Sequence, residues 1–242
     1  IGYYTLAYEL LSLFQNCCLS SFVDIGCADG YFVHLVKSKL NIVSSGLDIS
    51  SEYLRRMNQF YGISGVVGSV EKLPFKDNAF DVVLCREVLE HVVNPWSAAA
   101  ELLRITNKLL IVTTPAARSQ KKKERFIPDL DAQRDTHLHY FTESDLRGLF
   151  GEDVVVLATN SRVSSLARLL YERVRFKFLD AIPITKFLIW LDLLISRRLR
   201  ILASGNFLLL KTKNGGHYPH LKFDRELLNF VLVEDYRAQR QR

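Results

Sequence analysis

The residues from position 23 to 31 are the first in this sequence whose types and spacing could do chemistry. They read VDIGCADGY. A dinucleotide-binding turn has the pattern GxGxxG, and this run departs from it because position 28 is alanine. A pyrophosphate prefers bare N–H groups at a helix start, so the carboxylates of Asp24 and Asp29 would repel it. They suit a cationic ligand, such as one carrying a sulfonium and an ammonium group. The alternative is that Gly26 and Gly30 only form a tight turn between a strand and a helix.

A second carboxylate stands where a nucleoside would need it. Asp48 follows a predicted strand and lies 22 residues after Gly26 (48 − 26 = 22). An acidic residue at the end of the second strand of such a fold can accept hydrogen bonds from both hydroxyls of a ribose. The pair of features favours a ligand that combines a ribose with a positive charge over a purely structural turn.

A third group of polar residues could serve the reaction itself. Glu87, Glu90 and His91 are spaced i, i+3 and i+4, which places them on one face of a predicted helix. His137 and His139 come later in the chain. Histidine is a suitable general base at neutral pH, so His91 and His137 are the catalytic candidates. Two carboxylates and two imidazoles could also hold a divalent cation.

The elements that must position these residues alternate along the first 115 residues. Apolar runs without alternation indicate strands covered on both faces, and the intervening segments have helical periodicity, which predicts a parallel sheet with helices on both faces. Ligands bind at the carboxyl ends of the strands in such sheets, where the candidate residues fall. The predicted strands are 21–25, 42–47, 65–70, 80–85 and 109–113, and the predicted helices are 3–19, 31–40, 51–61, 87–93 and 95–107.

The second half of the chain is less regular. We expect a polar, basic loop over 116–136 and a helix from Thr142 to Phe150, with a capping box formed by Thr142 and Asp145. Two further strands, 154–158 and 206–211, complete seven. The predicted domain spans 1–215, with a helical insertion at 161–202 that forms a lid, and a tail of uncertain structure at 216–242.

Three runs of this sequence resemble one known family. They are VDIGCADGY from position 23, LDIS from position 47 and VEKLPFKDNAFDVVLCREVLEHV from position 70. Together they resemble class I methyltransferases of the type-11 group, which depend on S-adenosylmethionine (SAM). The resemblance is dense over about residues 20–115 and thin over 136–211. It implies a Rossmann-like α/β fold with seven mostly parallel strands, and SAM as the cofactor.

The resemblance also implies which residues meet the methionine part of SAM. Asp24 would face the ammonium group, directly or through water. Gly26 and Gly30 would flank the methionine portion, and Arg86 and Glu87 would lie near its end.

The remaining contacts concern the nucleoside. Asp48 would bind the ribose and Ile49 would lie beside the adenine, with Ser69 and Val70 at the adenine edge. The family usually has Asp in place of Ser69, and a hydroxyl accepts a hydrogen bond from the adenine amino group more weakly than a carboxylate. The complete set expected to bind the cofactor is Asp24, Gly26, Cys27, Ala28, Gly30, Asp48, Ile49, Ser69, Val70, Arg86 and Glu87.

The same resemblance bears on the metal question in two ways. The ExxEH run with a later histidine is similar to RNA 3′-terminal 2′-O-methyltransferases and to quinone-ring O-methyltransferases, in which a metal orients the acceptor oxygens. The EVLEHV run is also common among type-11 methyltransferases that use no metal. We therefore expect no metal here, and a site at Glu87, Glu90, His91 and His137 remains the alternative.

Composition bounds the partners. The net charge is +6, and basic residues cluster at 121–123, 197–200 and 237–242, which suggests an anionic partner or solvated basic faces. The four cysteines show no CxxC pair and suit a reducing compartment, and the longest apolar stretch is too short to span a membrane. We expect a soluble cytoplasmic protein, with peripheral contact with an anionic membrane as an option.

The expected function is methyl transfer from SAM to a small-molecule or lipid-like acceptor that the sequence does not identify. Apolar and basic residues in 161–202 favour an apolar acceptor. Two alternatives stay open: an RNA methyltransferase, suggested by the basic runs, and a SAM-binding subunit without catalysis, suggested by Ser69.

Overall fold

Seven strands, five α-helices and one 3₁₀ turn make up the described part of the chain. The computed structural model describes residues 2–15, 18–117, 137–161 and 203–213. The strands are β1 (Ser21–Ile25), β2 (Val43–Asp48), β3 (Val66–Val67), β4 (Phe80–Arg86), β5 (Thr106–Pro115), β6 (Val155–Ser161) and β7 (Ala203–Thr212). The helices are α1 (Gly2–Gln15), α2 (Tyr31–Leu40), α3 (Ser51–Tyr61), α4 (Pro95–Ile105) and α6 (Glu143–Phe150), with a 3₁₀ turn η1 (Leu89–His91).

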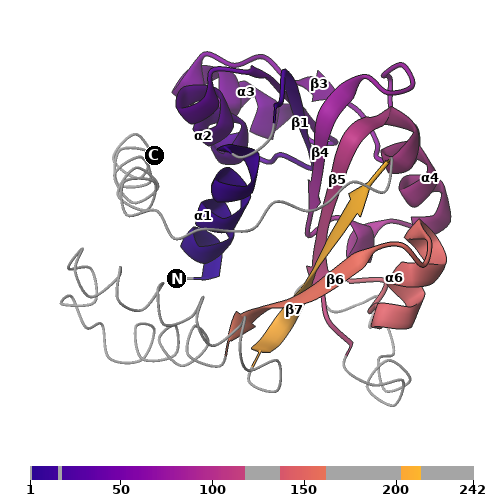
Figure 1. The fold of residues 1–242 in the computed structure, drawn as a ribbon. Helices are drawn as coiled ribbons and strands as arrows, with labels where there is room; N and C mark the ends of the chain where they lie inside the picture. Colours follow the sequence, from indigo (N-terminus) through magenta and orange to yellow (C-terminus); the bar gives the residue numbers. More distant parts are fainter. Residues whose placement is uncertain (1, 16–17, 118–136, 162–202, 214–242) are drawn as a thin grey trace, which may run out of the picture. The chain divides into compact units, whose positions relative to one another are not determined.

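The strands form one sheet with the order β3-β2-β1-β4-β5-β7-β6. The pairings of β1 with β2, β1 with β4, β2 with β3 and β4 with β5 are all parallel. In Figure 1 the arrows of β6 and β7 point in opposite directions, so the sheet is mixed but mostly parallel. The Rossmann-like fold expected from the sequence is confirmed. The carboxyl ends of β1, β2, β4 and β5 therefore meet at one edge of the sheet.

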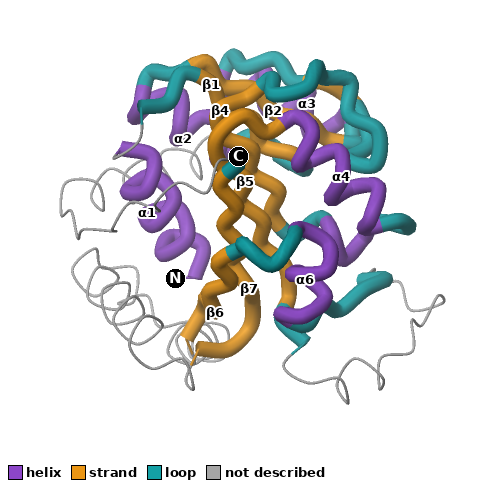
Figure 2. The backbone as a smooth tube through the Cα atoms, turned by 45° about the vertical axis from the view of Figure 1, so that its right-hand side comes forward, coloured by secondary structure: helices purple, strands orange, loops and turns teal. Residues whose placement is uncertain are grey.

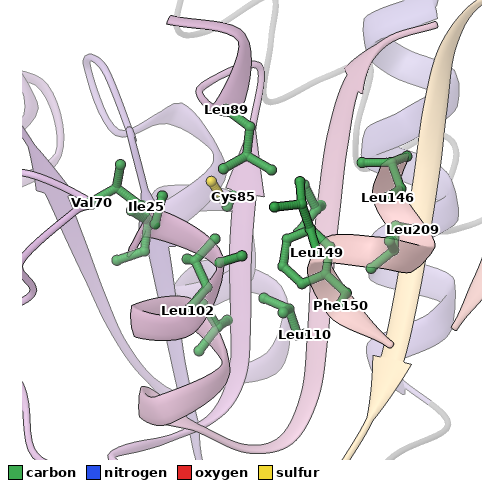
Figure 3. Close-up of a cluster of buried hydrophobic side chains, with 14 of the residues drawn as sticks. Ile25, Val70, Cys85, Leu89, Leu102, Leu110, Leu146, Leu149, Phe150 and Leu209 are labelled. Carbon is green, nitrogen blue, oxygen red and sulfur yellow. The ribbon is translucent and has the colours of Figure 1, made fainter. Parts of the chain in front are cut away.

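Helices cover both faces of the sheet, α2 and α3 on one side and α4 and α6 on the other (Figure 1). The tube view in Figure 2 shows the same division, with α4 and α6 together beside β5. Successive residues of a strand point to opposite faces, so Val23 and Ile25 enter the core under α4 and α6. Figure 3 shows that core, in which Leu102 of α4 and Phe150 of α6 meet the buried side chains of the strands. Asp24 consequently faces the other layer.

Polar side chains fix where three of these helices begin. Ser50 accepts a hydrogen bond from the N–H of Tyr53 at the start of α3. Asn94 accepts from two amides of the first turn of α4, which carries Pro95 at its first position. Thr142 and Asp145 form the expected capping box of α6. The caps of α3 and α4 fix helix starts that follow β2 and β4, at the carboxyl edge of the sheet. The cap of α6 fixes a helix start that follows the segment of His137.

Two predicted elements differ from the observed ones in kind or extent, and others differ at their ends, such as the strand expected over 109–113, which spans Thr106–Pro115. The strand expected over 65–70 is reduced to Val66–Val67, because the chain turns at Ser69, which bridges to Lys72. The helix expected over 87–93 is wrong, since only the 3₁₀ turn at Leu89–His91 forms. Pro95 disfavours helical backbone at the residue before it, and too few residues remain after β4 for a longer helix. Glu87 therefore lies outside any helix and does not share a helical face with Glu90 and His91.

The chain divides into two compact units. One comprises residues 19–157 and 207–218, and contains β1 to β5 with α2, α3, α4 and α6; the other comprises residues 1–18, 158–206 and 219–242. The loop expected at 116–136 lies outside the described residues except for Ala116 and Ala117, of which Ala116 bridges to Phe141. The insertion expected at 161–202, apart from Ser161, and the tail at 216–242 also lie outside the described residues. None of the helices in the described ranges is long and apolar enough to cross a bilayer.

Candidate cofactor and acceptor site

The turn after β1 keeps the backbone close to its neighbours on both sides. Gly26 and Gly30 both have φ of +78°, in the left-handed region that favours glycine. A Cβ at Gly26 would lie 2.2 Å from the side chain of Val88, and one at Gly30 would lie 2.2 Å from that of Met57. Ala28 is also left-handed, with φ of 47°. The turn thus needs glycine at both positions. Its amides at the carboxyl edge of the sheet donate within the protein, those of Gly26 and Cys27 to the carbonyl of Leu47.

Asp48 ties this turn to the end of β2. One carboxylate oxygen accepts the N–H of Ala28 at 2.8 Å, and the other accepts the N–H of Ser50 at 2.8 Å. Each oxygen keeps further acceptor capacity, since a carboxylate has about four lone-pair sites. The two bonds fix the carboxylate in an orientation that can receive a vicinal diol, as the sequence predicts for a ribose.

Asp24 is the most unusual group at this edge. Its side chain is 1% exposed, and neither carboxylate oxygen has a hydrogen-bond partner among the described residues. Burial raises its pKa to about 6, and the nearby Arg86 opposes that rise. A buried carboxylate without partners is costly unless a cation meets it. This observation fits the expected ammonium group of SAM.

Arg86 and Glu87 leave β4 beside Asp24. The guanidinium of Arg86 lies 4.5 Å from the centroid of the Phe32 ring, in a cation–π contact. Glu87 has φ of 52°, and its carboxylate accepts the hydroxyl of Thr113 at 2.8 Å. A left-handed glutamate is strained, and such strain often occurs at functional sites. Both residues lie at the end of the strand, where the sequence predicts the methionine end of SAM.

The adenine side agrees with the prediction unevenly. Ile49 is 78% exposed at the end of β2, so it is accessible to a flat ligand. The hydroxyl of Ser69 accepts a hydrogen bond from the N–H of Glu71 at 3.2 Å. This bond uses part of the acceptor capacity that the sequence analysis assigned to the adenine amino group. The side chains of Val70 and Cys27 are buried, with 5% and 2% exposure, so any contact of theirs with the cofactor must come from the main chain.

Glu90, His91 and His137 come together next to this edge. One ligand atom from each lies within 4.8 Å of the other two. The rings of His91 and His137 have centroids 4.7 Å apart at an angle of 66°. Glu90 is fully buried, whereas His91 is exposed and His137 is half-buried. The sequence suggested that these three residues, together with Glu87, could share a metal ion. The helical face that it expected for Glu87, Glu90 and His91 does not form.

Main-chain bonds hold the His137 segment in place. The carbonyl of Glu90 accepts the N–H of Leu138 at 2.6 Å and that of His139 at 3.1 Å. The ring of His139 contacts the carbonyl of Val92 at 2.9 Å. His139 therefore supports the segment, and His137 is the imidazole that joins Glu90 and His91.

Two residues that the sequence analysis did not select also belong to the site. Thr113 and Thr114 end β5, and both are buried. Thr113 donates to Glu87, and Thr114 donates to Glu90 at 3.3 Å. The sequence did hold a signal for them, since two hydroxyl side chains follow the apolar run of β5. That strand ends at the same edge of the sheet as β4, so its last polar residues belong near the candidate site.

Comparisons with known proteins agree with this geometry. Residues 23–109 match the profile of the family described as Methyltransferase domain. An uncharacterised protein of Methanocaldococcus jannaschii is 36% identical over 121 residues, which are 50% of this chain and 51% of that protein. Norajmaline N-methyltransferase of Rauvolfia serpentina is 32% identical over 91 residues, 34% of this chain and 31% of the enzyme. The chain thus spans about half or less of the length of these two relatives.

A solved structure extends the likeness of the fold. A SAM-dependent methyltransferase from Archaeoglobus fulgidus superposes with a TM-score of 0.57 at 16% identity, over 87% of this chain and 93% of that one. The fold is that of SAM-dependent methyltransferases, and residues 23–109 carry the segment that matches the methyltransferase domain family. This match implies S-adenosylmethionine as the cofactor of the domain.

Proposed function

We propose that this protein transfers a methyl group from SAM to a small-molecule or lipid-like acceptor. The observation that carries the proposal is the pair of carboxylates on adjacent strands. Asp48 is held by two amides in position for a ribose, and Asp24 is buried without a partner. A ligand with a ribose at one end and an ammonium group at the other satisfies both.

The protein's own groups then have defined tasks. When bound, SAM supplies an electrophilic methyl carbon; the bond from that carbon to sulfur breaks as the bond to the acceptor atom forms, and S-adenosylhomocysteine leaves. The glycine turn and Asp48 hold the cofactor in one position. This raises the rate of methyl transfer, because alignment of donor and acceptor lowers the barrier. His91 and His137 are the candidate bases for the proton that the acceptor loses.

The nature of the acceptor rests on composition and on a relative. The segment 161–202 is rich in large apolar residues, which favours an apolar acceptor. One of the relatives, norajmaline N-methyltransferase, is named for methylating nitrogen in a small molecule. Both features support a small or lipid-like acceptor over RNA.

Calorimetric titration with SAM and with S-adenosylhomocysteine tests the cofactor half of the proposal. We expect micromolar-range binding to the wild-type protein. Asp48→Asn should weaken it by roughly 10- to 100-fold, since a hydrogen bond to a charged group contributes about 1.5–3 kcal/mol. The matched control is Asp77→Asn, an exposed carboxylate paired with Arg104 away from the turn, which should bind as the wild type does. Tight binding of NAD with no binding of SAM would refute the proposal.

A transfer assay tests the catalytic half. The protein is incubated with SAM labelled in its methyl group and with separate pools of small amines, phenols, lipids and total RNA. Label in a small or lipid-like fraction supports the proposal, whereas label in RNA alone identifies an RNA methyltransferase. SAM binding with no label in any fraction favours a non-catalytic subunit.

A further inference from the structure

We propose that Glu90, His91 and His137 form a binding site for one divalent transition-metal ion beside the cofactor site. The proposal replaces the expectation from the sequence that no metal is bound here. It goes beyond methyl transfer, because the site would hold the ion whether or not an acceptor is present.

The geometry of the three donors is close to that of a coordination shell. Their ligand atoms lie within 4.8 Å of one another. Metal–ligand distances of about 2.0–2.2 Å place two ligands of one ion at most about 4.4 Å apart. Small side-chain rotations would therefore close the set around an ion. The hydrogen bonds from Leu138 and His139 to the carbonyl of Glu90 already fix the loop that carries His137.

The buried carboxylate is the independent observation that points to a cation. Glu90 has 0% exposure, and its Oε1 atom meets no donor group among the described residues; the carboxyl beside it is that of Glu87. Its other oxygen accepts the hydroxyl of Thr114. A carboxylate in such surroundings is costly unless a positive charge compensates it.

A second carboxylate next to it increases that cost. Glu87 lies close enough to Glu90 for its negative charge to act on the buried carboxyl. A divalent ion would relieve the repulsion between the two acids as well as the burial of Glu90. Glu87 itself is oriented by Thr113, and it shapes the field at the ion from outside the three-residue set.

The donor types select the class of metal. Two imidazoles and one carboxylate suit zinc, cobalt, nickel, manganese or iron better than magnesium or calcium, which prefer oxygen donors. Three protein ligands leave at least one coordination position for water or another oxygen. The exposed ring of His91 gives an ion a route from solvent. Thr114 would act as a positioning residue, because it holds Glu90 through a hydrogen bond.

The ion has a consequence for the reaction, and this part rests on the proposed function. A bound cation lowers the pKa of an oxygen that coordinates it. An acceptor hydroxyl at the open position would then lose its proton to water more readily. In that state His91 and His137 hold the metal and do not serve as free bases.

Titration of the chelator-treated full chain with CoCl₂ tests the site, since bound Co²⁺ reports its geometry through visible absorption. We expect one equivalent to bind, with ZnCl₂ displacing it. Glu90→Gln, His91→Ala and His137→Ala should each weaken binding by at least about tenfold. Thr114→Val should have a smaller effect, and circular dichroism checks that each variant is folded.

His34→Ala is the matched control, because His34 lies on α2 and its ring contacts Ser38 away from the cluster. It should bind Co²⁺ as the wild type does. The absence of Co²⁺ binding, or binding that persists in the His91→Ala/His137→Ala double variant, overturns the proposal. Co²⁺ binding without SAM binding would refute the proposed function and leave the metal site standing, whereas the reverse result would refute the metal site alone.

Discussion

At the scale of single residues, Asp24 shows how a binding site stores an unfavourable charge. Its carboxylate is buried beside a single compensating guanidinium, and it has no hydrogen bond among the described residues. Such a group lowers the stability of the protein without its ligand and attracts a cationic ligand in return. The sequence could predict the role of Asp24 from its place before the glycine turn, but not the degree of its burial.

Replacement of Asp24 by asparagine should stabilise the protein without SAM in a pH-dependent way. The folded-state pKa of about 6 exceeds the usual value of 3.8 for an aspartate, so the folded state binds more protons between these pH values and stability falls as pH rises through them. The ionised form then costs up to roughly 3 kcal/mol above pH 6, at about 1.4 kcal/mol per pKa unit. Urea unfolding of both proteins from pH 4.5 to 8 measures the difference, which should grow with pH.

The same variant should bind SAM more weakly, because the ammonium group loses its carboxylate. Parallel stability profiles for Asp24→Asn and the wild type across that pH range would show that Asp24 is not the strained group inferred here.

Glu87 marks the limit of residue-scale prediction. Its left-handed backbone and its bond to Thr113 depend on β5, which is more than twenty residues away in the chain. Local spacing suggested a helix instead. Helical periodicity is a local signal, and it was overridden by the turn that Pro95 and Asn94 impose.

At the scale of elements, the turn after β1 depends on two different demands made of glycine. Gly26 needs both a left-handed backbone and space beside Val88. Gly62, at the end of α3, needs only the backbone, since no atom lies within 4 Å of a Cβ placed there. Substitutions at the two positions therefore distinguish backbone strain, present at both, from steric clash of the new Cβ, present only at Gly26.

Gly62→Ala should lower the free energy of unfolding by about 1 kcal/mol. Alanine costs free energy in the left-handed conformation, and the lower conformational entropy of the unfolded chain offsets part of that cost. Gly26→Ala should lower it by about 1–3 kcal/mol more, because its Cβ must displace Val88. It should also weaken SAM binding, which Gly62→Ala should leave unchanged. Denaturant unfolding and calorimetry measure both effects, and equal losses for the two variants would exclude crowding as a cause.

The start of α6 gives a second test at this scale. Thr142 and Asp145 form a capping box directly after the segment that carries His137. Thr142→Ala should cost about 1 kcal/mol, the usual effect of losing an N-cap side chain. Ser51→Ala, at the exposed first position of α3, should stay within about 0.5 kcal/mol of the wild type. A loss at Thr142 no larger than at Ser51 would mean that the cap does not stabilise α6.

The elements also show why most of the fold was predictable. Apolar runs in β1, β4 and β5, and the Leu47–Asp48 end of β2, locate these four strands from local sequence. The full length of β5, Thr106–Pro115, exceeds its apolar run and was not predicted. β3 is short because its pairing with β2 ends after two residues, which depends on the turn at Ser69. The meeting of His137 with His91 depends on hydrogen bonds between distant segments, and the sequence could suggest it only through residue type.

At the scale of the whole molecule, charge is the property that the fold does not explain. The chain carries 32 Lys and Arg residues against 26 Asp and Glu residues. The two carboxylates proposed to meet SAM are acidic, so the excess of basic residues does not serve the cofactor. An anionic surface is one partner that a surplus of this kind attracts, and a lipid-like acceptor would be found there.

We therefore expect the protein to sediment with vesicles that contain phosphatidylserine and not with vesicles of phosphatidylcholine alone. The attraction should fall with salt, because the screening length shortens from about 10 Å at 0.1 M to about 3 Å at 1 M. Replacing Lys121, Lys122 and Lys123 by glutamine should weaken binding by up to about 3 kcal/mol if all three reach the surface, at about 1 kcal/mol each. Replacing Lys37, Lys39 and Lys108, which the structure places on α2 and β5, removes the same charge elsewhere and is the control. An equal loss in both triple variants would indicate attraction by net charge alone, and binding that does not change with salt would show that electrostatics does not bring this protein to a membrane.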